Sequence, residues 1–549
     1  MQDTDRLAIE TIQLNKQAII FLPSRASAEK TAEDIAKLTS FSLPELEHEI
    51  LRALSIPTKQ CRRLSHCIKK GIAFHHSGLT NSQKELIEES FKIGKIKIIC
   101  ATPTLAAGLS LPVFRVIIKS LKRYNERWGM DWIPVLEYLQ MAGRAGRPEY
   151  EQFGESIVIT SSQAEKEEIY EKYICGVPEE IYSKLAAEPI LRTHLLSLIS
   201  SGIIQDHYTL RNFFAQTFWA KQFNDFTKLE QITNKVLNQL NEWEFITIEN
   251  SKVNNINQSS DHKNISNKNS NKNNVNHPTS EFISAANLNR SEQKPNEKTT
   301  QNNPEKKIRA TLLGKRISEL YLDPLTAKHL LDSLSNFNQT KNNFSLLQMI
   351  SHTLEIRPLL SLKKKDENTI QEELNKRYNY LLEKEPSVFD LEYGEFMNSI
   401  KTALFFEEWI DEKDEDYLLE KYDIRPGEIR VKMETADWLL YGSEELANIQ
   451  NNREAVKEIK KLRLRLEYGV KEELLTLLKL KGIGRIRARK LYSHNLKDIG
   501  DIKNIDITSL GQILGKAVAE DIKKQVGEEI KEIPKGTRKG QLSMEKFGG

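Results

Sequence analysis

The sequence predicts a multidomain chain that begins with an α/β domain and continues as helical domains. The 549 residues, of which 39% are hydrophobic, are enough for three or four domains that each bury a core. Short β-rich runs alternate with helical stretches between residues 21 and 160, which is typical of a parallel sheet covered by helices. After residue 306 the spacing of apolar residues is almost entirely helical.

Composition and charge narrow the class of protein. No stretch approaches the roughly 20 apolar residues of a membrane-spanning helix, and the N-terminus does not resemble a signal peptide, so we expect a cytoplasmic protein. The 80 basic residues nearly balance the 77 acidic ones, so a nucleic-acid surface requires local clusters of charge. Cys61, His66 and Cys67 lack a second ligand pair at zinc-site spacing, which predicts reduced thiols and no metal site.

A tract rich in Asn, Ser, Lys and Gln interrupts the chain at about residues 250–305. It carries too little apolar surface to offset the entropy of ordering it, so we predict a disordered insertion that acts as a tether.

A pair of arginines is the first candidate for binding chemistry. The segment YLQMAGRAGRP places Gln140, Arg144 and Arg147 at helical spacing, so both arginines are expected on one helix face. Two planar guanidinium groups suit a polyphosphate, and small residues such as Gly143 allow a close approach. An isolated pair of this kind is more often a solvated helix face. The surrounding segments therefore decide whether these arginines bind a polyphosphate.

Four segments occur in a fixed order: FLPSRASAEK, GIAFHHSGL, ATPTLAAGLSLP and QMAGRAGRP. Together they closely resemble motifs IV, IVa, V and VI of superfamily 2 helicases of the Ski-two-like branch. In that family these motifs build the second of two RecA-like domains, and ATP lies in the cleft between the two. The resemblance therefore implies a RecA-like domain over residues 1–175.

The resemblance also assigns roles around the nucleotide. It implies that Arg144 and Arg147 reach the γ-phosphate, where an arginine finger is worth on the order of 10³–10⁵ in rate. Gln140 is expected to sense or position the same phosphates, and Gly108 and Gly143 to lie against the nucleotide.

Motif V is expected to link the nucleotide to the nucleic-acid backbone. By the resemblance, Thr102, Thr104 and Gly108 make this link, because hydroxyls and closely approaching main chain suit phosphate oxygens. The family usually has Asn where this chain has Ser110.

Neither the phosphate loop G-x-x-x-x-G-K-[ST] nor the D-E-x-H box occurs in the chain. Residues 17–22 already read as the first strand of the second RecA-like domain. We therefore expect ATP and Mg²⁺ at an interface that a first RecA-like domain on a separate polypeptide completes, and we expect no ATP hydrolysis by this chain alone.

The segment KSLKRYNERWGMDWIPVLEY predicts a β-hairpin around residues 125–131. In the family a hairpin here wedges the duplex apart. Tyr124, Trp128 and Trp132 supply aromatic faces for an unpaired base, or else they are packed core, and the sequence leaves both open.

The next segments resemble the archaeal fork-repair helicases, relatives of the polymerase theta helicase domain. SKLAAEPILRTHLLSLISSGII resembles their winged helix, expected over residues 176–312, with EWEFITIE and KKIRATLLGKRISELY as the two sides of the wing. A helical ratchet domain is expected over residues 313–465, and its long helix starts after Pro426 and Gly427.

Trp438 is the candidate DNA contact of this long helix. In the family a Trp here stacks on a base, and stacking is worth roughly 1–3 kcal/mol per base regardless of sequence. The family's basic position falls on Val431, so Arg430 or Lys432 is expected to substitute. The alternative is that Trp438 is a core residue.

Residues 466–527 carry the hairpin of a helix-hairpin-helix module, LLKLKGIGRIRARKLYSHN. Gly482 and Gly484 permit a tight turn whose amides can face a phosphate. The positive charge of the module comes from Arg485, Arg487, Arg489 and Lys490.

The tail, residues 528–549, is expected to be flexible. Gln541, Met544 and Phe547 follow the spacing of a sliding-clamp-binding peptide, but Gly548 stands where a second aromatic residue is usual.

The sequence thus predicts the C-terminal part of an ATP-dependent 3′–5′ DNA helicase that acts on single-stranded or forked DNA in replication-fork repair. Two alternatives remain at this point: an RNA helicase of the same branch, and a non-catalytic subunit or remnant that binds single-stranded DNA.

Overall fold

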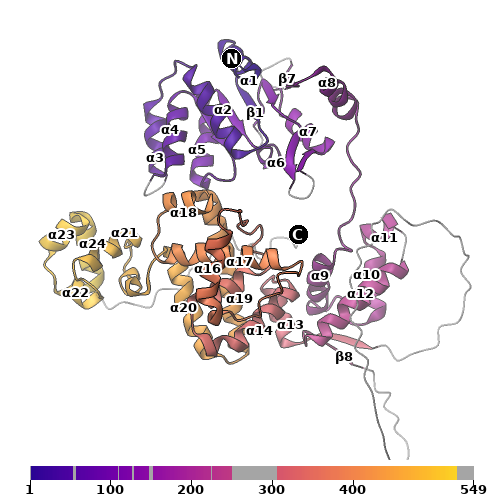
Figure 1. The fold of residues 1–549 in the computed structure, drawn as a ribbon, viewed down its shortest axis with the longest axis vertical. Helices are drawn as coiled ribbons and strands as arrows, with labels where there is room; N and C mark the ends of the chain where they lie inside the picture. The colour runs from indigo at the N-terminus through magenta and orange to yellow at the C-terminus, as the bar shows by residue number, and fades with distance from the viewer. Residues whose placement is uncertain are drawn as a thin grey trace, which may run out of the picture. The chain divides into compact units, whose positions relative to one another are not determined.

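A computed structural model of the chain describes residues 2–53, 57–108, 111–125, 129–146, 153–223, 226–249 and 306–527. The chain divides into two compact units, one formed by residues 1–182 with 320–549 and one by residues 183–319 (Figure 1). The predicted disordered insertion and the predicted clamp-binding tail lie outside the described residues. Within the described residues, no helix is long and apolar enough to cross a membrane.

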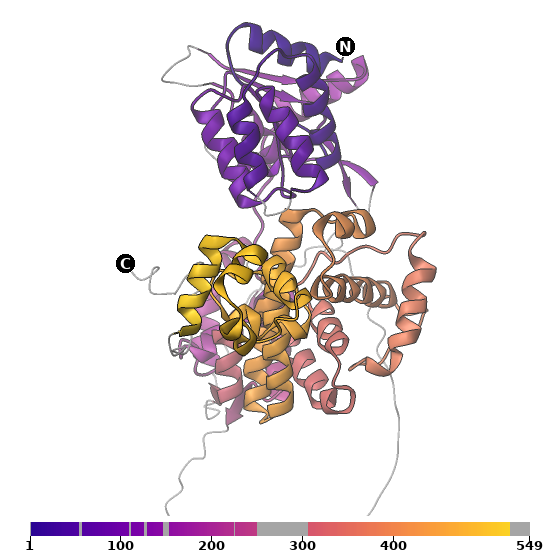
Figure 2. The ribbon, with the colours of Figure 1, turned by 90° about the vertical axis from the view of Figure 1, so that its left-hand side faces the viewer.

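A five-stranded parallel sheet forms the core of the N-terminal part of the first unit. Its order is β2-β3-β1-β4-β7, with every neighbouring pair parallel. The strands are β1 (Ala18–Phe21), β2 (Ile72–His75), β3 (Ile98–Ala101), β4 (Arg115–Ile118) and β7 (Glu155–Val158). Every residue of β1 to β4 is buried because helices cover the sheet (Figure 2). The predicted α/β domain with a parallel sheet is confirmed.

The helices around this sheet begin where the sequence offers capping residues. Ser24, Thr58 and Thr80 each accept a hydrogen bond from the backbone N–H three residues further on. The helices are α1 (Asp3–Gln13), α2 (Arg25–Lys37), α3 (Pro44–Arg52), α4 (Lys59–Lys69), α5 (Asn81–Lys92), α6 (Thr104–Gly108), α7 (Val135–Ala142), α8 (Gln163–Ile169) and the π-helix η1 (Tyr170–Ile174).

Strands β5 (Lys122–Asn125) and β6 (Gly129–Trp132) pair antiparallel, with Lys122 opposite Trp132. The predicted hairpin between motifs V and VI is therefore present. Trp128 lies outside the described residues.

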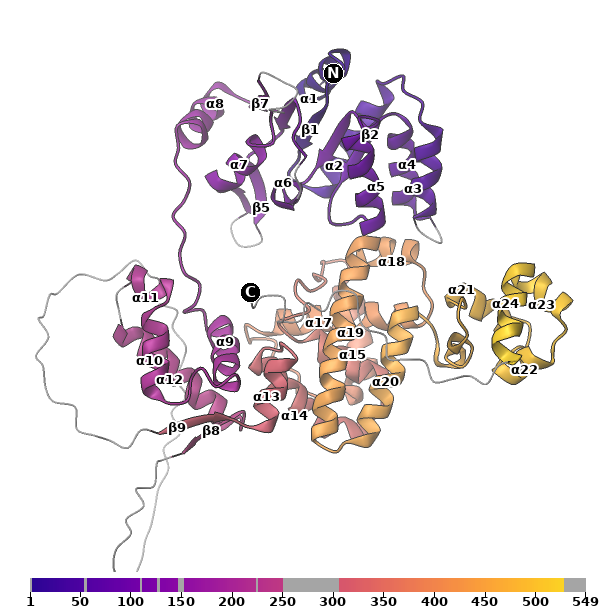
Figure 3. The same ribbon diagram turned by 180° about the vertical axis from the view of Figure 1, so that it is seen from behind.

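The second unit, residues 183–319, consists of helices and one strand pair (Figure 3). Its elements are α9 (Glu188–Ser200), α10 (His207–Ala215), α11 (Phe218–Phe223), α12 (Phe226–Glu242), β8 (Ile246–Glu249), β9 (Lys307–Ala310) and α13 (Leu312–Glu319). Strands β8 and β9 pair antiparallel, from Ile246 opposite Ala310 to Glu249 opposite Lys307. The two segments expected to form the sides of a wing thus lie side by side.

Residues 320–469 are helical, as predicted. The helices are α14 (Pro324–Thr340), α15 (Asn343–Ser351), α16 (Glu367–Arg377), the 3₁₀ helix η2 (Tyr378–Tyr380), α17 (Tyr393–Ile410), α18 (Glu415–Tyr422), α19 (Pro426–Ile449) and α20 (Arg453–Tyr468). Every residue of α15 from Phe344 to Ser351 is buried, so this helix lies at the centre of the bundle. The long helix α19 starts at Pro426, where proline suits the first helical turn.

The last helices have a hydrophobic core of their own. Buried residues from Val470 to Val526 form this separate cluster, and Figure 2 shows α21 to α24 gathered in one group. The elements are η3 (Glu472–Leu474), η4 (Leu477–Lys479), α21 (Arg485–Ser493), α22 (Ile499–Asn504), α23 (Ile507–Leu514) and α24 (Lys516–Gly527).

Candidate functional site

The motif V segment leaves the sheet at the carboxyl end of β3. The hydroxyls of Thr102 and Thr104 lie 3.0 Å apart, and Thr104 begins α6, which ends at Gly108. In parallel sheets this edge is where ligands bind, so the two hydroxyls are placed where phosphate oxygens could accept from them.

Arg144 does not lie on a helix face, and the expectation that it shares one with Gln140 and Arg147 is wrong. Helix α7 ends at Ala142, and Gly143 caps it with a hydrogen bond to the carbonyl of Leu139. The chain then turns, and a bridge between Val113 and Ala145 runs beside the sheet. The helix therefore ends before the arginine pair.

Beyond the helix end, the Arg144 side chain binds motif V. Its Nε donates to the carbonyl oxygen of Ala106 at 3.1 Å, and its Nη2 donates to the same oxygen. Ala106 lies in α6, two residues after Thr104. The motif VI arginine is therefore joined directly to the helix that the motif V threonines introduce.

The remaining nucleotide candidates lie around this contact. Gln140 is exposed near the end of α7, and Gly143 is exposed at its cap. A Cβ on Gly143 would lie 3.0 Å from the carbonyl oxygen of Leu139, so the position is tight. Arg147 and Ser110 lie outside the described residues.

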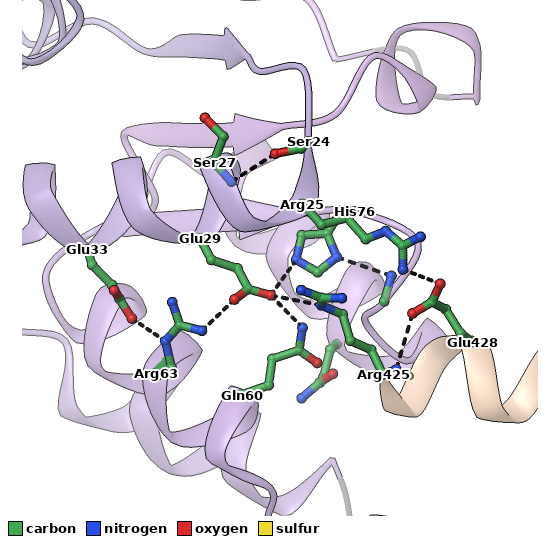
Figure 4. A network of polar contacts seen from close by, with 12 residues as sticks. Ser24, Arg25, Ser27, Glu29, Glu33, Gln60, Arg63, His76, Arg425 and Glu428 are labelled. Carbon is green, nitrogen blue, oxygen red and sulfur yellow. Dashed lines mark hydrogen bonds and ion pairs between the residues drawn. The ribbon is translucent and has the colours of Figure 1, made fainter. Parts of the chain in front are cut away.

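A buried carboxylate links motifs IV and IVa to the helical part of the unit (Figure 4). Glu29 of α2 is 3% exposed. Its Oε1 accepts from Nε2 of Gln60 at 2.9 Å and from Nε of Arg425 at 3.2 Å, and it lies 3.2 Å from Nε2 of His76. Arg63 donates to the other oxygen. Three donors therefore converge on one carboxylate, beside the imidazole of His76, and one of these donors comes from 396 residues away.

The network fixes the protonation of its members. Burial alone would raise the pKa of Glu29, but hydrogen bonds from His76 and Gln60 and the charge of Arg425 outweigh it and lower the pKa to about 2. Burial lowers the pKa of His76. The backbone N–H of Gly78 donates to Nδ1 of His76 at 3.1 Å, which requires a neutral ring that carries its proton on Nε2, toward Glu29.

Sequence reasoning missed this network. Glu29 and His76 lie within motifs IV and IVa, but their partner Arg425 is far along the chain. The available signal was the pair Pro426–Gly427, since glycine in the first turn of a long helix indicates a close backbone approach.

Trp438 is half-buried on α19, and its indole Nε1 donates to the carbonyl oxygen of Leu320 at 3.1 Å. Val431 is 61% exposed. Of its neighbours, Lys432 donates to the carbonyl oxygens of Ile356 and Pro358, and burial lowers its pKa. Arg430 is exposed and pairs with Glu434 on the same helix at 3.3 Å, so it is the neighbour better placed to meet a DNA backbone.

The glycine hairpin before α21 has the predicted turn. Gly482 has φ +81°, and Gly484 precedes the helix as its N-cap. Arg487 and Lys490 are exposed at this end of the molecule. The guanidinium of Arg487 also donates to the carbonyl oxygen of Gly482 at 2.6 Å, which holds it beside the turn.

The other two arginines of this segment bind the chain itself. Arg485 donates to the carbonyl oxygen of Lys413 at 2.8 Å, its guanidinium lies 5.3 Å from the ring centre of Trp409, and burial lowers its pKa. Arg489 donates to Glu412 and Glu473, each at 2.7 Å, and these hydrogen bonds raise its pKa.

In the hairpin, Trp132 is half-buried. The Nζ of Lys122 lies 4.0 Å from its ring centre, and the ring of Tyr173 lies 5.9 Å away. Trp132 thus packs against its own domain on at least one side, which favours the packed-core alternative at this residue.

Comparison with known proteins matches two family models to the chain. The helicase conserved C-terminal domain matches residues 3–149, and the archaeal helicase domain 4 matches residues 344–469, which include α19. The ATP-dependent DNA helicase Hel308 of Pyrococcus horikoshii is 33% identical, over 98% of this chain and 68% of that protein. The chain belongs to the Hel308 helicase family. The Hel308 protein of Methanococcus vannielii is 34% identical over 95% of this chain and 68% of its own length.

Membership of the Hel308 family confirms the predicted resemblance to the archaeal superfamily 2 helicases. The first matched model spans motifs IV to VI, and the second spans the ratchet segment with Trp438. The two ends of the Glu29–Arg425 contact therefore lie in two different segments that the Hel308 family shares.

Proposed function

We propose that this chain is the C-terminal part of an ATP-dependent 3′–5′ DNA helicase that acts on single-stranded or forked DNA in replication-fork repair. The observation that carries the proposal is the contact between Arg144 and the carbonyl of Ala106. A phosphate bound by Arg144 would act through this contact on α6 and on the hydroxyls of Thr102 and Thr104. The name of the relatives, ATP-dependent DNA helicase, supports the same reading.

The residues at this edge fit one side of a nucleotide. Hydroxyls and a guanidinium donate to phosphate oxygens, which makes Arg144, Arg147 and Gln140 the proposed contacts, with Gly108 and Gly143 allowing close approach. The phosphate loop and the acidic box that holds Mg²⁺ would come from a first RecA-like domain, because neither sequence pattern occurs in this chain. We propose that a separate polypeptide supplies that domain.

The remaining parts are proposed to hold DNA. The helices and strand pair around residues 183–319 would form a winged helix, α19 would carry Trp438 against a base, and the turn at Gly482 would meet a phosphate as a helix-hairpin-helix module. The support is the pairing of β8 with β9, the half-buried position of Trp438 and the exposure of Arg487. The tail with Gln541, Met544 and Phe547 is a proposed contact for a sliding clamp.

The deciding experiment measures DNA-stimulated ATP hydrolysis by this chain alone and after mixing with a first RecA-like half from the same genome. Activity only in the mixture is expected. Strand displacement on substrates with single-stranded tails of opposite polarity then tests the direction, and a forked substrate tests the preference for forks.

Two other outcomes correspond to the alternatives. DNA binding without ATP hydrolysis in either sample would favour a non-catalytic subunit that binds single strands. Tighter binding to an RNA strand than to the DNA strand of the same sequence would favour an RNA helicase.

A further inference from the structure

The first turn of α19 is closed by the loop that follows β2. The backbone N–H of Gly427 donates to the carbonyl oxygen of Gly78 at 3.1 Å. A Cβ on Gly427 would lie 2.3 Å from the carbonyl oxygen of Leu79 and 2.6 Å from that of Ser77. The N–H groups of a first helical turn have no partner within the helix, and carbonyl groups are favourable at this positive end. The loop of motif IVa therefore serves as the cap of α19.

Side chains reinforce this backbone contact on both sides (Figure 4). Arg425, the N-cap of α19, donates to the buried carboxylate of Glu29 at 3.2 Å. Glu428 accepts from the backbone N–H of Arg425 at 3.1 Å with one oxygen and pairs with Arg25 of α2 with the other. The start of α19 is thus held by one backbone hydrogen bond and two ionic contacts from motifs IV and IVa.

The packing at this place leaves little freedom. Glu29 is also bound by Gln60 and Arg63, and Nε2 of His76 lies 3.2 Å from it, so the acceptor of Arg425 is itself fixed. A Cβ on Gly78 would lie 2.4 Å from Cδ of Arg425, which shows how closely the two chains approach. Buried charged hydrogen bonds of this kind specify one geometry, because a partner lost from either side leaves a buried charge uncompensated.

We propose that these contacts, referred to below as the joint, fix the orientation of α19 relative to the sheet. Arg425 and Gly427 are then positioning residues for the proposed DNA-contacting face of this helix. The joint deepens the proposed function and rests on it. Trp438 lies 12 residues beyond Pro426, about 18 Å along the helix at 1.5 Å per residue. A tilt of about 10° at the start of α19 would displace Trp438 by about 3 Å, close to the thickness of a stacked base.

Distances between two spin labels test the joint in the chain alone. One label is placed on the exposed thiol of Cys175 in the sheet domain, and the other on an Asn448→Cys substitution at the exposed end of α19. Arg425→Gln is expected to widen the distance distribution by about twofold, and Arg425→Lys to widen it less, because an ammonium still reaches Glu29 as a point charge. An unchanged width in Arg425→Gln, or a broad distribution already in the wild-type chain, would overturn the joint.

Arg463→Gln is the matched control for Arg425→Gln. Arg463 donates to Asp437 and to Glu444, both on α19, at 2.8 Å. Its side chain is about as buried as that of Arg425, but its partners lie within the helical part. We expect the control to lower thermal stability and to leave the distance distribution narrow. Broadening by both variants would indicate general loosening and would contradict a specific joint.

A glycine pair gives a second test on the same helix. Gly427→Ala places a methyl group against backbone carbonyl oxygens, so the mean label distance is expected to shift by about 2 Å or more while the helix content is kept. At Gly442 the nearest atom to a new Cβ is the flexible Cδ1 of Leu322, at 2.9 Å, so Gly442→Ala is expected to leave the distance unchanged. Equal distances in both variants would count against the joint.

In the reconstituted complex, disruption of the joint is expected to uncouple ATP hydrolysis from DNA unwinding. Arg425→Gln is expected to keep DNA-stimulated ATP hydrolysis within about twofold and to lower the base pairs unwound per ATP by about tenfold. Unchanged unwinding per ATP would overturn the inference. If the wild-type mixture hydrolyses no ATP, the proposed function fails, and the label distances still decide the joint.

Discussion

The indole Nε1 of Trp438 donates a hydrogen bond to the carbonyl oxygen of Leu320, 118 residues earlier in the chain. Leu320 is buried and directly precedes Tyr321, whose φ is +57°. The bond holds the edge of the indole at a turn of the backbone and so fixes the orientation of the ring, which would lower the entropic cost of the proposed stacking on a base.

We expect Trp438→Ala to weaken binding of single-stranded DNA by about 5- to 100-fold, since stacking on one base is worth roughly 1–3 kcal/mol. Trp438→Phe keeps an aromatic face and loses the hydrogen bond, so it should retain most of the affinity with a lower thermal stability. Fluorescence anisotropy of a labelled oligonucleotide measures the affinity of both variants, and thermal unfolding measures their stability. Full affinity in the alanine variant would place the indole in the core.

For Arg144→Ala we expect ATP hydrolysis by the reconstituted complex to fall on the order of 10³-fold or more, because the guanidinium proposed to reach the γ-phosphate is lost. Arg144→Lys should recover little, since a single ammonium cannot supply two directed donors. Steady-state hydrolysis at saturating ATP and DNA is the measurement. Retained hydrolysis in Arg144→Ala would show that the arginine only fastens α7 to α6.

Arg487 and Arg489 are expected to behave differently although they are neighbours on α21. Arg487 is exposed, so Arg487→Ala should weaken DNA binding and reduce the salt dependence of the binding constant by about 0.7–1 in log–log slope. Arg489 binds Glu412 and Glu473, so Arg489→Ala should mainly lower stability. Binding titrations at several salt concentrations separate the two. Identical salt slopes would contradict the assignment.

Stability should depend on the charge of Glu29 in acid. Its pKa is lowered from 4.5 to about 2 in the folded chain, so the carboxylate stabilises the fold fully above pH 4.5, and this contribution is lost as the pH falls from 4.5 toward 2. Glu29→Gln is expected to lower the free energy of unfolding by about 3 kcal/mol or more at neutral pH, because it also leaves Arg63 and Arg425 without their carboxylate. Denaturant unfolding of both proteins between pH 2.5 and 7 should show the curves converging in acid. A pH-independent difference would contradict the assignment.

The sheet and the helical part could be predicted because their signals are local. Apolar β-rich runs predicted β1, β3, β4 and β7, and the pair Pro426–Gly427 predicted the start of α19 to within two residues. The end of α7 was not predicted, because helical spacing continued through Gly143 while the cap and the bridge at Val113 turned the chain.

Side-chain partners were harder to predict than elements. The candidates Arg485 and Arg489 were chosen for their charge, but acidic residues and a carbonyl group from the preceding helices bind them. The Glu29–Arg425 pair joins residues 396 positions apart, and although Pro426–Gly427 indicates a close backbone approach, the local pattern does not specify which side chain Arg425 meets. Local patterns set the elements, whereas three-dimensional packing decides which charges remain available.

The pairing of β8 with β9 bears on how the length of the sequence between these two strands can vary. Its described register runs from Ile246 opposite Ala310 to Glu249 opposite Lys307, on the two sides of the 56-residue interval 250–305. Doubling the length of such an interval adds only about 0.6 kcal/mol of closure entropy. If the interval is the flexible insertion that the sequence predicts, changes in its length need no compensating mutation, and we expect a fluorescent reporter spliced into it to leave β8 and β9 paired.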